Sequence, residues 1–374
     1  MNYDRISTPV LVVNPGIVKS NIRRINEKCQ KSGVLFRPHF KTHQSKQIGR
    51  WFRDEGISSI AVSSVAMARY FASDGWNDIT VAFPYNPREH VETDALSREI
   101  SLTLTIPSPE SAHILASKAE SRLSVMIKVD TGYNRSGTRW DNLNDLSKII
   151  DIICTNPLLT VKGLLTHAGD TYKSESTTQA RERYTLSVSR MKQVRDSLQH
   201  PGLMISVGDT PSASLFSGYP DIDELRAGNF VFYDLMQLNI GSCSFDDIAA
   251  VMVCPVVDVR HRENIVVIYG GAVHLSKDYV TIDGSPVYGQ IVRLTKTGWS
   301  SYDSPLYLSS LSQEHGIIKT EAGGTAGFRT GELVGVIPVH SCLTADLAGR
   351  YLLTDGTTAD HLSGTSEWLY NGQV

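Results

Sequence analysis

The chain has 374 residues, 41% of them hydrophobic, which is enough to bury one large core or two smaller ones. Its 36 basic and 39 acidic residues give a net charge of −3 without a long basic run, which argues against nucleic acid as a partner. No apolar run approaches the roughly 20 residues of a membrane span, and the first residues lack the pattern of a signal peptide. The five cysteines are scattered and odd in number, so a reduced, cytoplasmic compartment is expected.

The first two thirds of the chain alternate short β-rich runs with segments of helical spacing. The predicted strands are Val34–Lys41, Ser58–Ser63, Asp78–Phe83, Ser101–Ile106, Leu123–Asp130, Val161–His167, Leu203–Gly208 and Leu225–Phe232. Predicted helices between them include Ser45–Glu55, Val65–Asp74, Pro109–Glu120, Asp141–Cys154 and Thr177–Leu198. This alternation predicts a parallel α/β fold, and residues 8–245 fit a (β/α)8 TIM-like barrel of roughly 250 residues. A doubly wound open sheet is the alternative.

Beyond residue 245 the pattern changes to short strands joined by turns, without long helices. The predicted strands are Ala249–Val259, Ile265–Tyr269, Tyr279–Ile282, Gln290–Leu294, Pro305–Leu311 and Glu332–His340. We therefore predict a second, mostly β domain over residues 246–374.

Lys41 is the first candidate functional residue. On a strand, Arg37, His39 and Lys41 would share one face, and burying such residues inside a barrel is costly unless they have partners there. Lys41 lies at the predicted carboxyl end of its strand, where barrel active sites gather, and a lysine amine there can form a Schiff base with an aldehyde. A solvated lysine at a strand end is the alternative.

The segment Arg37–His43, RPHFKTH, resembles the lysine segment of the D-serine dehydratase and D-threonine aldolase group. That group belongs to the alanine-racemase-like, fold-type III enzymes that use pyridoxal 5′-phosphate. Several further motifs occur in the order of this family, from the N-terminal region to the C-terminal domain. The resemblance implies that Lys41 is the catalytic residue and binds pyridoxal phosphate covalently.

Two further motifs extend the resemblance to strands five and six. In Ile127–Gly137, IKVDTGYNRSG, the family's arginine corresponds to Arg135, which would approach the phenolic oxygen of the cofactor. In Gly163–Tyr172, GLLTHAGDTY, His167 would stack on the pyridine ring, and Tyr172 would contact cofactor or substrate. Without the resemblance, an ion-paired arginine and a structural histidine are the alternatives.

The phosphate group would be held after the seventh and eighth strands, where barrel phosphate sites commonly lie. The segment Val207–Ser214, VGDTPSAS, offers Gly208 and Thr210, and backbone N–H groups at a helix start suit a phosphate. The resemblance adds a second contact through Gly228 and Asn229. By the same resemblance, Arg226 would face the pyridine nitrogen.

The segment Pro338–Thr344, PVHSCLT, places His340 and Cys342 two residues apart, on one side of a continuing strand. Imidazole and thiolate are favourable zinc ligands, although this spacing alone is a weak signal. The position matches the metal motif of D-serine dehydratases, whereas the D-threonine aldolase branch has histidine and aspartate there. Cys342 therefore favours the dehydratase branch, with zinc bound by His340 and Cys342.

The resemblance implies a carbon–oxygen lyase that converts D-serine, or a related D-3-hydroxy amino acid, to a 2-oxo acid and ammonia. A metal-dependent D-threonine aldolase, an amino-acid racemase and a non-catalytic carrier of the cofactor are the alternatives. The expected partner is a small D-amino acid, with neither nucleic acid nor membrane. Fold-type III enzymes usually pair head to tail, so a homodimer is expected.

Overall fold

The computed structural model describes residues 5–198, 200, 202–321 and 323–364. The chain forms two compact units, and neither is one continuous stretch. The barrel unit consists of Arg23–Lys41 and Gly49–Gly228, and the β unit of Met1–Ile22, Thr42–Ile48 and Asn229–Val374. The domain bounds predicted above, 8–245 and 246–374, stay a prediction, and residues 322 and 365–374 of the second domain lie outside the described residues.

The barrel unit contains a sheet of parallel strands in the order β2-β10-β9-β8-β6-β5-β4-β3. A bridge between His39 and Ala61 joins its two ends, so the barrel is nearly closed. The predicted (β/α)8 barrel is confirmed, and each predicted strand overlaps an observed one. The strands are β2 (Leu35–Phe36), β3 (Ser59–Val62), β4 (Asp78–Pro84), β5 (Ser101–Ile106), β6 (Leu123–Asp130), β8 (Leu159–Thr166), β9 (Met204–Val207) and β10 (Glu224–Leu225), with β7 (Thr138–Arg139) paired to β6.

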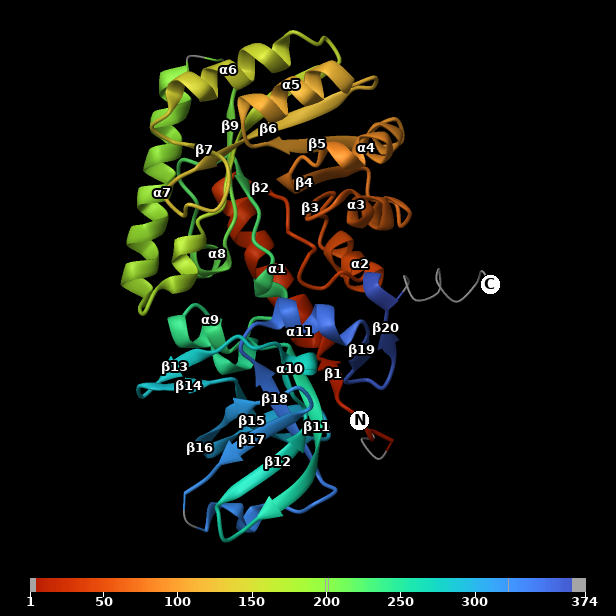
Figure 1. Cartoon of the computed structure of the whole chain (residues 1–374), viewed down its shortest axis with the longest axis vertical. Coiled ribbons are helices and arrows are strands. Elements are labelled where there is room, and N and C mark those ends of the chain that lie inside the picture. Colours follow the sequence, from red (N-terminus) through yellow and green to blue (C-terminus); the bar gives the residue numbers. More distant parts are fainter. Residues whose placement is uncertain (1–4, 199, 201, 322, 365–374) are drawn as a thin grey trace. The chain divides into compact units, whose positions relative to one another are not determined.

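Helices α3 to α7 lie on the outside of these strands (Figure 1). On α7, the buried residues Ala180, Tyr184, Val188 and Met191 recur every three or four positions, which is the spacing of one helix face. Capping side chains define the starts of α3, α5, α6 and α8. The helices are α1 (Pro15–Ser32), α2 (Lys46–Asp54), α3 (Val65–Ala72), α4 (His90–Ser97), α5 (Pro109–Lys118), α6 (Leu143–Cys154), α7 (Thr177–Leu198) and α8 (Thr210–Leu215), with short 3₁₀ helices η1 (Pro87–Glu89) and η2 (Gly169–Lys173).

Two predicted strands, Val34–Lys41 and Leu225–Phe232, are much shorter in the structure, as β2 and β10. The chain after β2 stays extended, and the N–H of His39 donates to the carbonyl oxygen of Ala227 at 2.8 Å. Pro38 has no N–H group, which interrupts the ladder. Lys41 therefore lies in a turn after the strand rather than on it.

The β unit contains a second sheet, in the order β12-β17-β16-β15-β18-β11-β1-β19-β20. Strand β1 (Val10–Val13) pairs with β11 (Ala250–Arg260) and β19 (Tyr351–Leu353), so the start of the chain completes a sheet built from its end. The predicted mostly β C-terminal domain is confirmed. The other strands are β12 (Ile265–Tyr269), β13 (Val280–Ile282), β14 (Ser285–Val287), β15 (Gly289–Thr295), β16 (Gly298–Leu311), β17 (His315–Lys319), β18 (Leu333–Pro338) and β20 (Thr358–Ala359).

The β unit also contains short helices: α9 (Leu235–Ile240), α10 (Ala272–Leu275), α11 (Ser341–Ala348), η3 (Asn229–Val231), η4 (Phe245–Asp247) and η5 (Gly324–Gly327). The predicted strand Glu332–His340 ends at Pro338, and α11 begins three residues later. His340 is the residue that precedes the first turn of α11, and Cys342 lies inside that turn. The continuing strand expected for this pair is therefore wrong, and a helix start replaces it.

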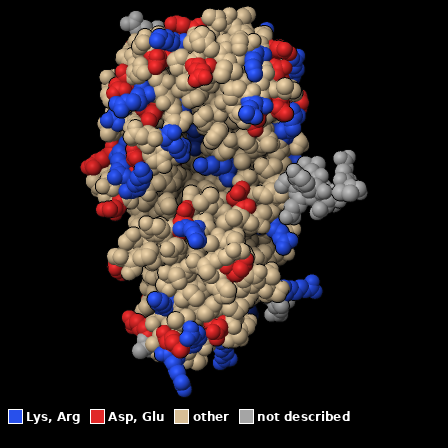
Figure 2. Space-filling model, viewed as in Figure 1, with Lys and Arg blue, Asp and Glu red and all other residues tan. Residues whose placement is uncertain are grey.

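The surface of the molecule carries charges of both signs. On the face drawn in Figure 2, basic and acidic side chains are interspersed, and neither forms a continuous field, in keeping with the net charge of −3. Among the described residues, no helix has the length and apolar character needed to cross a membrane.

Candidate active site

His167 follows β8 and is fixed by one strong hydrogen bond. Its Nδ1 lies 2.5 Å from the carbonyl oxygen of Gly208, and because a carbonyl can only accept, Nδ1 carries the proton. Burial lowers the pKa of His167 well below 6.5, and the charges of Arg135 and Lys128 lower it further. The ring is therefore neutral near pH 7, with an unprotonated Nε2.

Aromatic rings surround His167. The ring of Tyr133 meets it edge-on at 5.7 Å, and the ring of Tyr172 lies at 5.9 Å. The guanidinium group of Arg135 lies 5.1 Å from the centre of the Tyr133 ring, a cation–π distance. The hydroxyl of Tyr172 accepts a hydrogen bond from the N–H of Thr210 at 3.0 Å. The barrel unit thus brings together four residues predicted from three separate motifs: Arg135, His167, Tyr172 and Thr210.

The turn between β9 and α8 forms a buried polar cradle. A Cβ atom added at Gly208 would lie 2.6 Å from the carbonyl oxygen of Arg226, so only glycine fits there. The carboxylate of Asp209 accepts hydrogen bonds from the N–H of Ser212 and the hydroxyl of Thr171, both at 2.9 Å. The hydroxyl of Ser212 is buried and has no hydrogen-bond partner among the described residues. An unsatisfied hydroxyl at a helix start fits a phosphate group.

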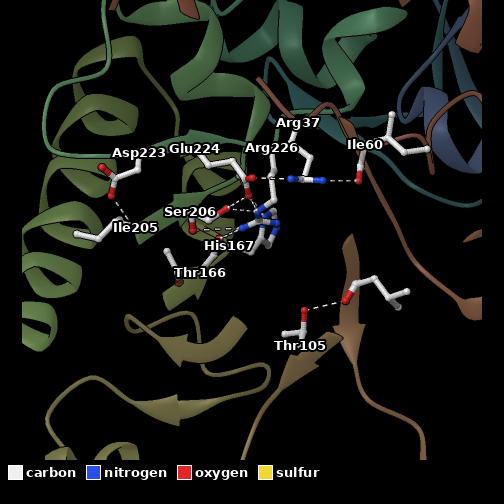
Figure 3. Close-up of polar contacts among 12 residues, drawn as sticks. Arg37, Ile60, Thr105, Thr166, His167, Ile205, Ser206, Asp223, Glu224 and Arg226 are labelled. Atoms are coloured by element: carbon white, nitrogen blue, oxygen red, sulfur yellow. Dashed lines mark hydrogen bonds and ion pairs between the residues drawn. The ribbon is translucent and has the colours of Figure 1, made fainter. Parts of the chain in front are cut away.

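Arg226, which follows β10, is held by a buried network (Figure 3). It donates hydrogen bonds to the Ser206 hydroxyl and the Thr166 carbonyl oxygen, both at 2.6 Å. Ser206 in turn donates to Glu224 at 2.6 Å, and Glu224 also accepts from Arg37 at 2.6 Å. Burial lowers the pKa of Arg226 to about 10 although the Glu224 charge opposes this, so Arg226 is cationic near pH 7.

Lys41 is exposed, and its neighbourhood is strongly positive. Its backbone N–H donates to Nδ1 of His39 at 3.3 Å. Burial, followed by the charge of Lys41, lowers the pKa of His39 well below 6.5. Burial, followed by Arg226 and Arg135, lowers the pKa of Lys128 to about 7. The charges of Lys41, Arg135 and Arg226 all lower the pKa values of His39 and Lys128, and this group of cations fits an anionic cofactor such as pyridoxal phosphate.

The β unit brings His340 and Cys342 together. Burial lowers the pKa of His340, but hydrogen bonds with Asp278 and Cys342 raise it more, to about 11. Asp278 and Cys342 thus both favour the positively charged form of the His340 imidazole. Nδ1 of His340 is 2.9 Å from Asp278, which leaves Nε2 for a metal ion, the usual arrangement of a carboxylate-supported metal ligand. The donor set fits zinc.

Two polar side chains reach the thiol of Cys342. The hydroxyl of Thr42 lies 3.1 Å from its sulfur, and the amide nitrogen of Asn229 lies 3.7 Å from it. The same amide also donates to Asp234 at 2.6 Å and Ser341 at 3.0 Å. Among the described residues, no group of three histidine, cysteine or acidic side chains could hold a metal ion.

The predicted site residues thus fall into two groups. Lys41, Arg135, His167, Tyr172, Gly208, Thr210 and Gly228 lie in the barrel unit, whereas Asn229, His340 and Cys342 lie in the β unit. The side-chain amide of Asn229 contacts the Ser341 hydroxyl and the sulfur of the predicted metal ligand Cys342, and the predicted phosphate contact through Gly228 and Asn229 stays a prediction. Roles for these residues stay predictions.

Sequence reasoning missed four residues of these groups: Tyr133, Glu224, Asp278 and Thr42. Tyr133 and Thr42 lie inside the quoted motifs, where an aromatic and a hydroxyl beside functional residues could have been noted. Asp278 lies 62 residues from His340, and Glu224 lies 187 residues from Arg37, so nothing local indicates either pairing.

Comparison with protein families gives two matches. The family described as “Alanine racemase, N-terminal domain” matches residues 13–235. The family described as “Putative serine dehydratase domain” matches residues 249–354. The two matches follow one another along the chain, as do the predicted barrel and β domains.

Three similar proteins are named for reactions of D-amino acids. A D-serine dehydratase of Dictyostelium discoideum is 26% identical, over 94% of each chain. A D-threo-3-hydroxyaspartate dehydratase of Delftia sp. (strain HT23) is 28% identical, over 94% of this chain and 96% of the other. A D-threonine aldolase of Arthrobacter sp. is 23% identical, over 95% and 91%.

Solved structures include close matches to the whole chain. The Delftia dehydratase superposes with a TM-score of 0.85 at 27% identity, over 96% of this chain and 98% of that one. A cysteine-to-alanine variant of a D-threo-3-hydroxyaspartate dehydratase, in the metal-free form, superposes with a TM-score of 0.86 at 27% identity and the same coverage. Because the first family match spans residues 13–235, more than half of the 374 residues, the chain belongs to the alanine racemase N-terminal domain family.

Proposed function

We propose that this protein is a pyridoxal-phosphate- and zinc-dependent lyase that converts D-serine, or a related D-3-hydroxy amino acid, to a 2-oxo acid and ammonia. Relatives named as dehydratases that span 94% of the chain support the reaction class. The alanine-racemase-like fold supports the cofactor. The observation that carries the proposal is the contact between the Cys342 sulfur and the Thr42 hydroxyl at 3.1 Å. Thr42 directly follows Lys41 in the chain, so the predicted metal ligand contacts the residue next to the predicted cofactor lysine.

The residues that would hold pyridoxal phosphate are Lys41, Arg135, His167, Tyr172, Gly208, Thr210, Gly228 and Asn229. When bound, this cofactor supplies an electron sink for the charge that develops at the α-carbon of the substrate. The neutral His167 presents a flat, uncharged ring, and Arg135 supplies the cation for the phenolic oxygen. The buried hydroxyl of Ser212 and the Gly208 turn receive the phosphate.

Lys41 moves the proton in this proposal. With the cofactor bound, the amine of Lys41 would take the proton from the α-carbon of the substrate. The α-proton and the β-hydroxyl of D-serine leave as water, and a water molecule then hydrolyses the imine form of the resulting enamine to pyruvate and ammonia.

His340 and Cys342 would hold the metal ion, which supplies a Lewis acid for the departing hydroxyl. Hydroxide is a poor leaving group without such help. Asp278 fixes the His340 ring so that Nε2 is the ligand atom, and the Thr42 hydroxyl orients the Cys342 thiolate. The metal-free form recorded for a cysteine variant of the 3-hydroxyaspartate dehydratase supports a metal at a cysteine in that relative.

The test is product analysis with the purified, zinc-loaded protein. D-serine should yield pyruvate and ammonia in equal amounts, and a chelator should suppress both. A Cys243→Ala variant should behave as the wild type, because Cys243 is a second cysteine of the β unit and lies outside the predicted metal pair. Formation of glycine and acetaldehyde from D-threonine, without pyruvate from D-serine, would instead identify an aldolase, the second candidate that the Arthrobacter relative supports.

We further propose that the protein forms a homodimer in the cytoplasm. Two cysteines, Cys29 and Cys254, are buried thiols, which supports a reducing compartment. Sedimentation at several concentrations would test the dimer, and a monomer at all of them would contradict it.

A further inference from the structure

The segment that follows the lysine has an unusual place in the fold. The post-lysine segment, Thr42–Ile48, lies in the β unit, although the residues before and after it belong to the barrel unit. A peptide bond joins its first residue to Lys41, so whatever holds this segment also limits where the backbone of Lys41 can lie.

Asp360 makes three hydrogen bonds to the post-lysine segment. Its carboxylate accepts from the hydroxyl of Ser45 at 2.9 Å and from the N–H groups of Lys46 and Gln47, both at 3.0 Å. The Ser45 hydroxyl in turn accepts from the N–H of Ile48 at 3.1 Å. The start of α2 is thus capped by a carboxylate more than 300 residues away, and carboxylates are favoured at helix starts.

A second set of contacts holds Gln44. This residue has a φ of 43°, a left-handed conformation that non-glycine residues adopt only when their surroundings enforce it. Its side chain donates to Asp346 at 2.8 Å, and its carbonyl oxygen accepts from the N–H of Leu362 at 2.8 Å. The hydroxyl of Tyr351 donates to the carbonyl oxygen of His43 at 2.5 Å. Contacts from Asp346, Tyr351 and Leu362 therefore hold His43 and Gln44 in place.

The two histidines beside Asp360 do not supply a balancing charge. Burial lowers the pKa of the neighbouring His43 to about 3 and that of His361 to about 4, so both rings are neutral near pH 7. The carboxylate is stabilised by hydrogen bonds from the post-lysine segment. Replacing it with an amide of the same size would keep the packing and weaken these contacts.

We propose that Asp360 is a positioning residue for Lys41, acting through the post-lysine segment. Asp360 lies beyond residue 354, where the second family match ends. The inference rests on the proposed function, because it assigns a purpose to the fixed geometry of Lys41. A few tenths of an ångström at the lysine amine matter because proton transfer requires close, aligned groups.

The test compares Asp360→Asn with Asp355→Asn in the holoenzyme. Asp355 lies in the same C-terminal segment, but its carboxylate binds only Thr357 in the described structure. For Asp360→Asn we expect kcat with D-serine to fall on the order of ten- to hundredfold and KM to change less than about twofold. Asp355→Asn should match the wild type in both constants.

A second readout is independent of turnover. Hydroxylamine removes pyridoxal phosphate from its lysine, and the loss of the cofactor's visible absorbance gives the rate. We expect Asp360→Asn to lose the cofactor several-fold faster than Asp355→Asn, and Asp360→Glu to recover part of the difference. Asp346→Asn, which weakens the part-buried contact to Gln44, should shift both readouts in the same direction and keeps the test decisive if Asp360→Asn does not fold.

Equal kcat and equal cofactor loss in Asp360→Asn and Asp355→Asn would overturn the proposal. So would a loss of activity that follows only a smaller folded fraction, measured by circular dichroism, with unchanged hydroxylamine rates. If the wild type binds the cofactor but releases no pyruvate from D-serine, the proposed function fails, and the hydroxylamine comparison still decides the role of Asp360. A protein with no cofactor absorbance would overturn both.

Discussion

Asp278 holds Nδ1 of His340 at 2.9 Å and so selects Nε2 as the nitrogen for a metal ion. We expect Asp278→Ala to weaken zinc binding by roughly 10- to 100-fold, the usual effect of removing a carboxylate behind a metal-binding histidine. Competition against a chromophoric chelator measures this affinity. Asp283→Ala, in the neighbouring β13–β14 turn, is the control, and equal affinities for the two variants would show that Asp278 does not support the ligand.

Glu224 pairs with two buried arginines: it accepts a hydrogen bond from Arg37 at 2.6 Å, and it lies 3.8 Å from Arg226, to which Ser206 also connects it. Glu224→Gln keeps the shape but removes the charge that is paired with Arg226, whereas Arg37 keeps its ion pair with Asp78. We expect the free energy of unfolding to fall by about 3–5 kcal/mol, as for other broken buried ion pairs. Urea denaturation measures it, with Glu263→Gln of the exposed pair with Arg260 as a control expected to change by less than about 1 kcal/mol. An equal fall in the free energy of unfolding of both variants would contradict the role of Glu224 as a buried counter-charge.

Individual residues could be predicted from the sequence when their neighbours along the chain carry the signal. Lys41, Arg135 and His167 each stand in a short motif, and those motifs occur in a family order. Asp278 and Asp360 have no such motif, because their partners are brought to them only by the fold. A carboxylate in a loop looks the same in sequence whether it supports a functional side chain or faces water.

At the scale of elements, the strands of the barrel were predicted well because buried parallel strands are short apolar runs between helices. Their ends were predicted less well. β2 and β10 are each only two residues long, shorter than predicted, because single hydrogen bonds rather than a continuous ladder hold the chain beyond them. α11 was missed because an eight-residue helix after a strand gives too few turns for a periodic pattern.

The β9–α8 turn provides a test at this scale. In Gly208→Ala, the added methyl would meet the carbonyl oxygen of Arg226 at 2.6 Å, and a backbone atom cannot move aside easily. We expect the turn to shift and the affinity for pyridoxal phosphate to fall more than about tenfold, because its phosphate contacts depend on exact backbone placement. Fluorescence titration of cofactor-free protein measures this. Gly16→Ala, which meets only the flexible Asn14 side chain, is the control, and equal affinities would contradict the assigned cradle.

At the scale of the whole molecule, the chain passes between its two units at 22/23, 41/42, 48/49 and 228/229. Two of these passages lie next to predicted site residues, Lys41 and Asn229. Sequence reading treats domains as consecutive stretches, so it assigned β1 to the barrel domain, whereas β1 pairs with β11 and β19. Pairing between strands some 240 residues apart leaves no local pattern.

Acid should destabilise the protein through its buried histidines. The pKa of His361 is about 4 in the folded chain and near 6.5 when unfolded, so between these values only the unfolded chain binds the proton. Stability is therefore constant above pH 6.5 and falls as pH decreases toward 4, by up to about 1.4 kcal/mol per pH unit for this group. Urea denaturation at pH 7.5, 6 and 5 should show a shallower fall for His361→Gln than for the exposed control His315→Gln. Identical slopes would contradict this.

We propose that Lys41, in the barrel unit, carries the cofactor, whereas His340 and Cys342, in the β unit, determine which bond breaks. The most direct test is pyruvate formation from D-serine by Cys342→Ala reconstituted with pyridoxal phosphate. We predict a cofactor absorbance like that of the wild type and a rate of pyruvate formation at least about 100-fold lower, because a Lewis acid contributes several kcal/mol to departure of hydroxide. Pyruvate formation at the wild-type rate would contradict the claim.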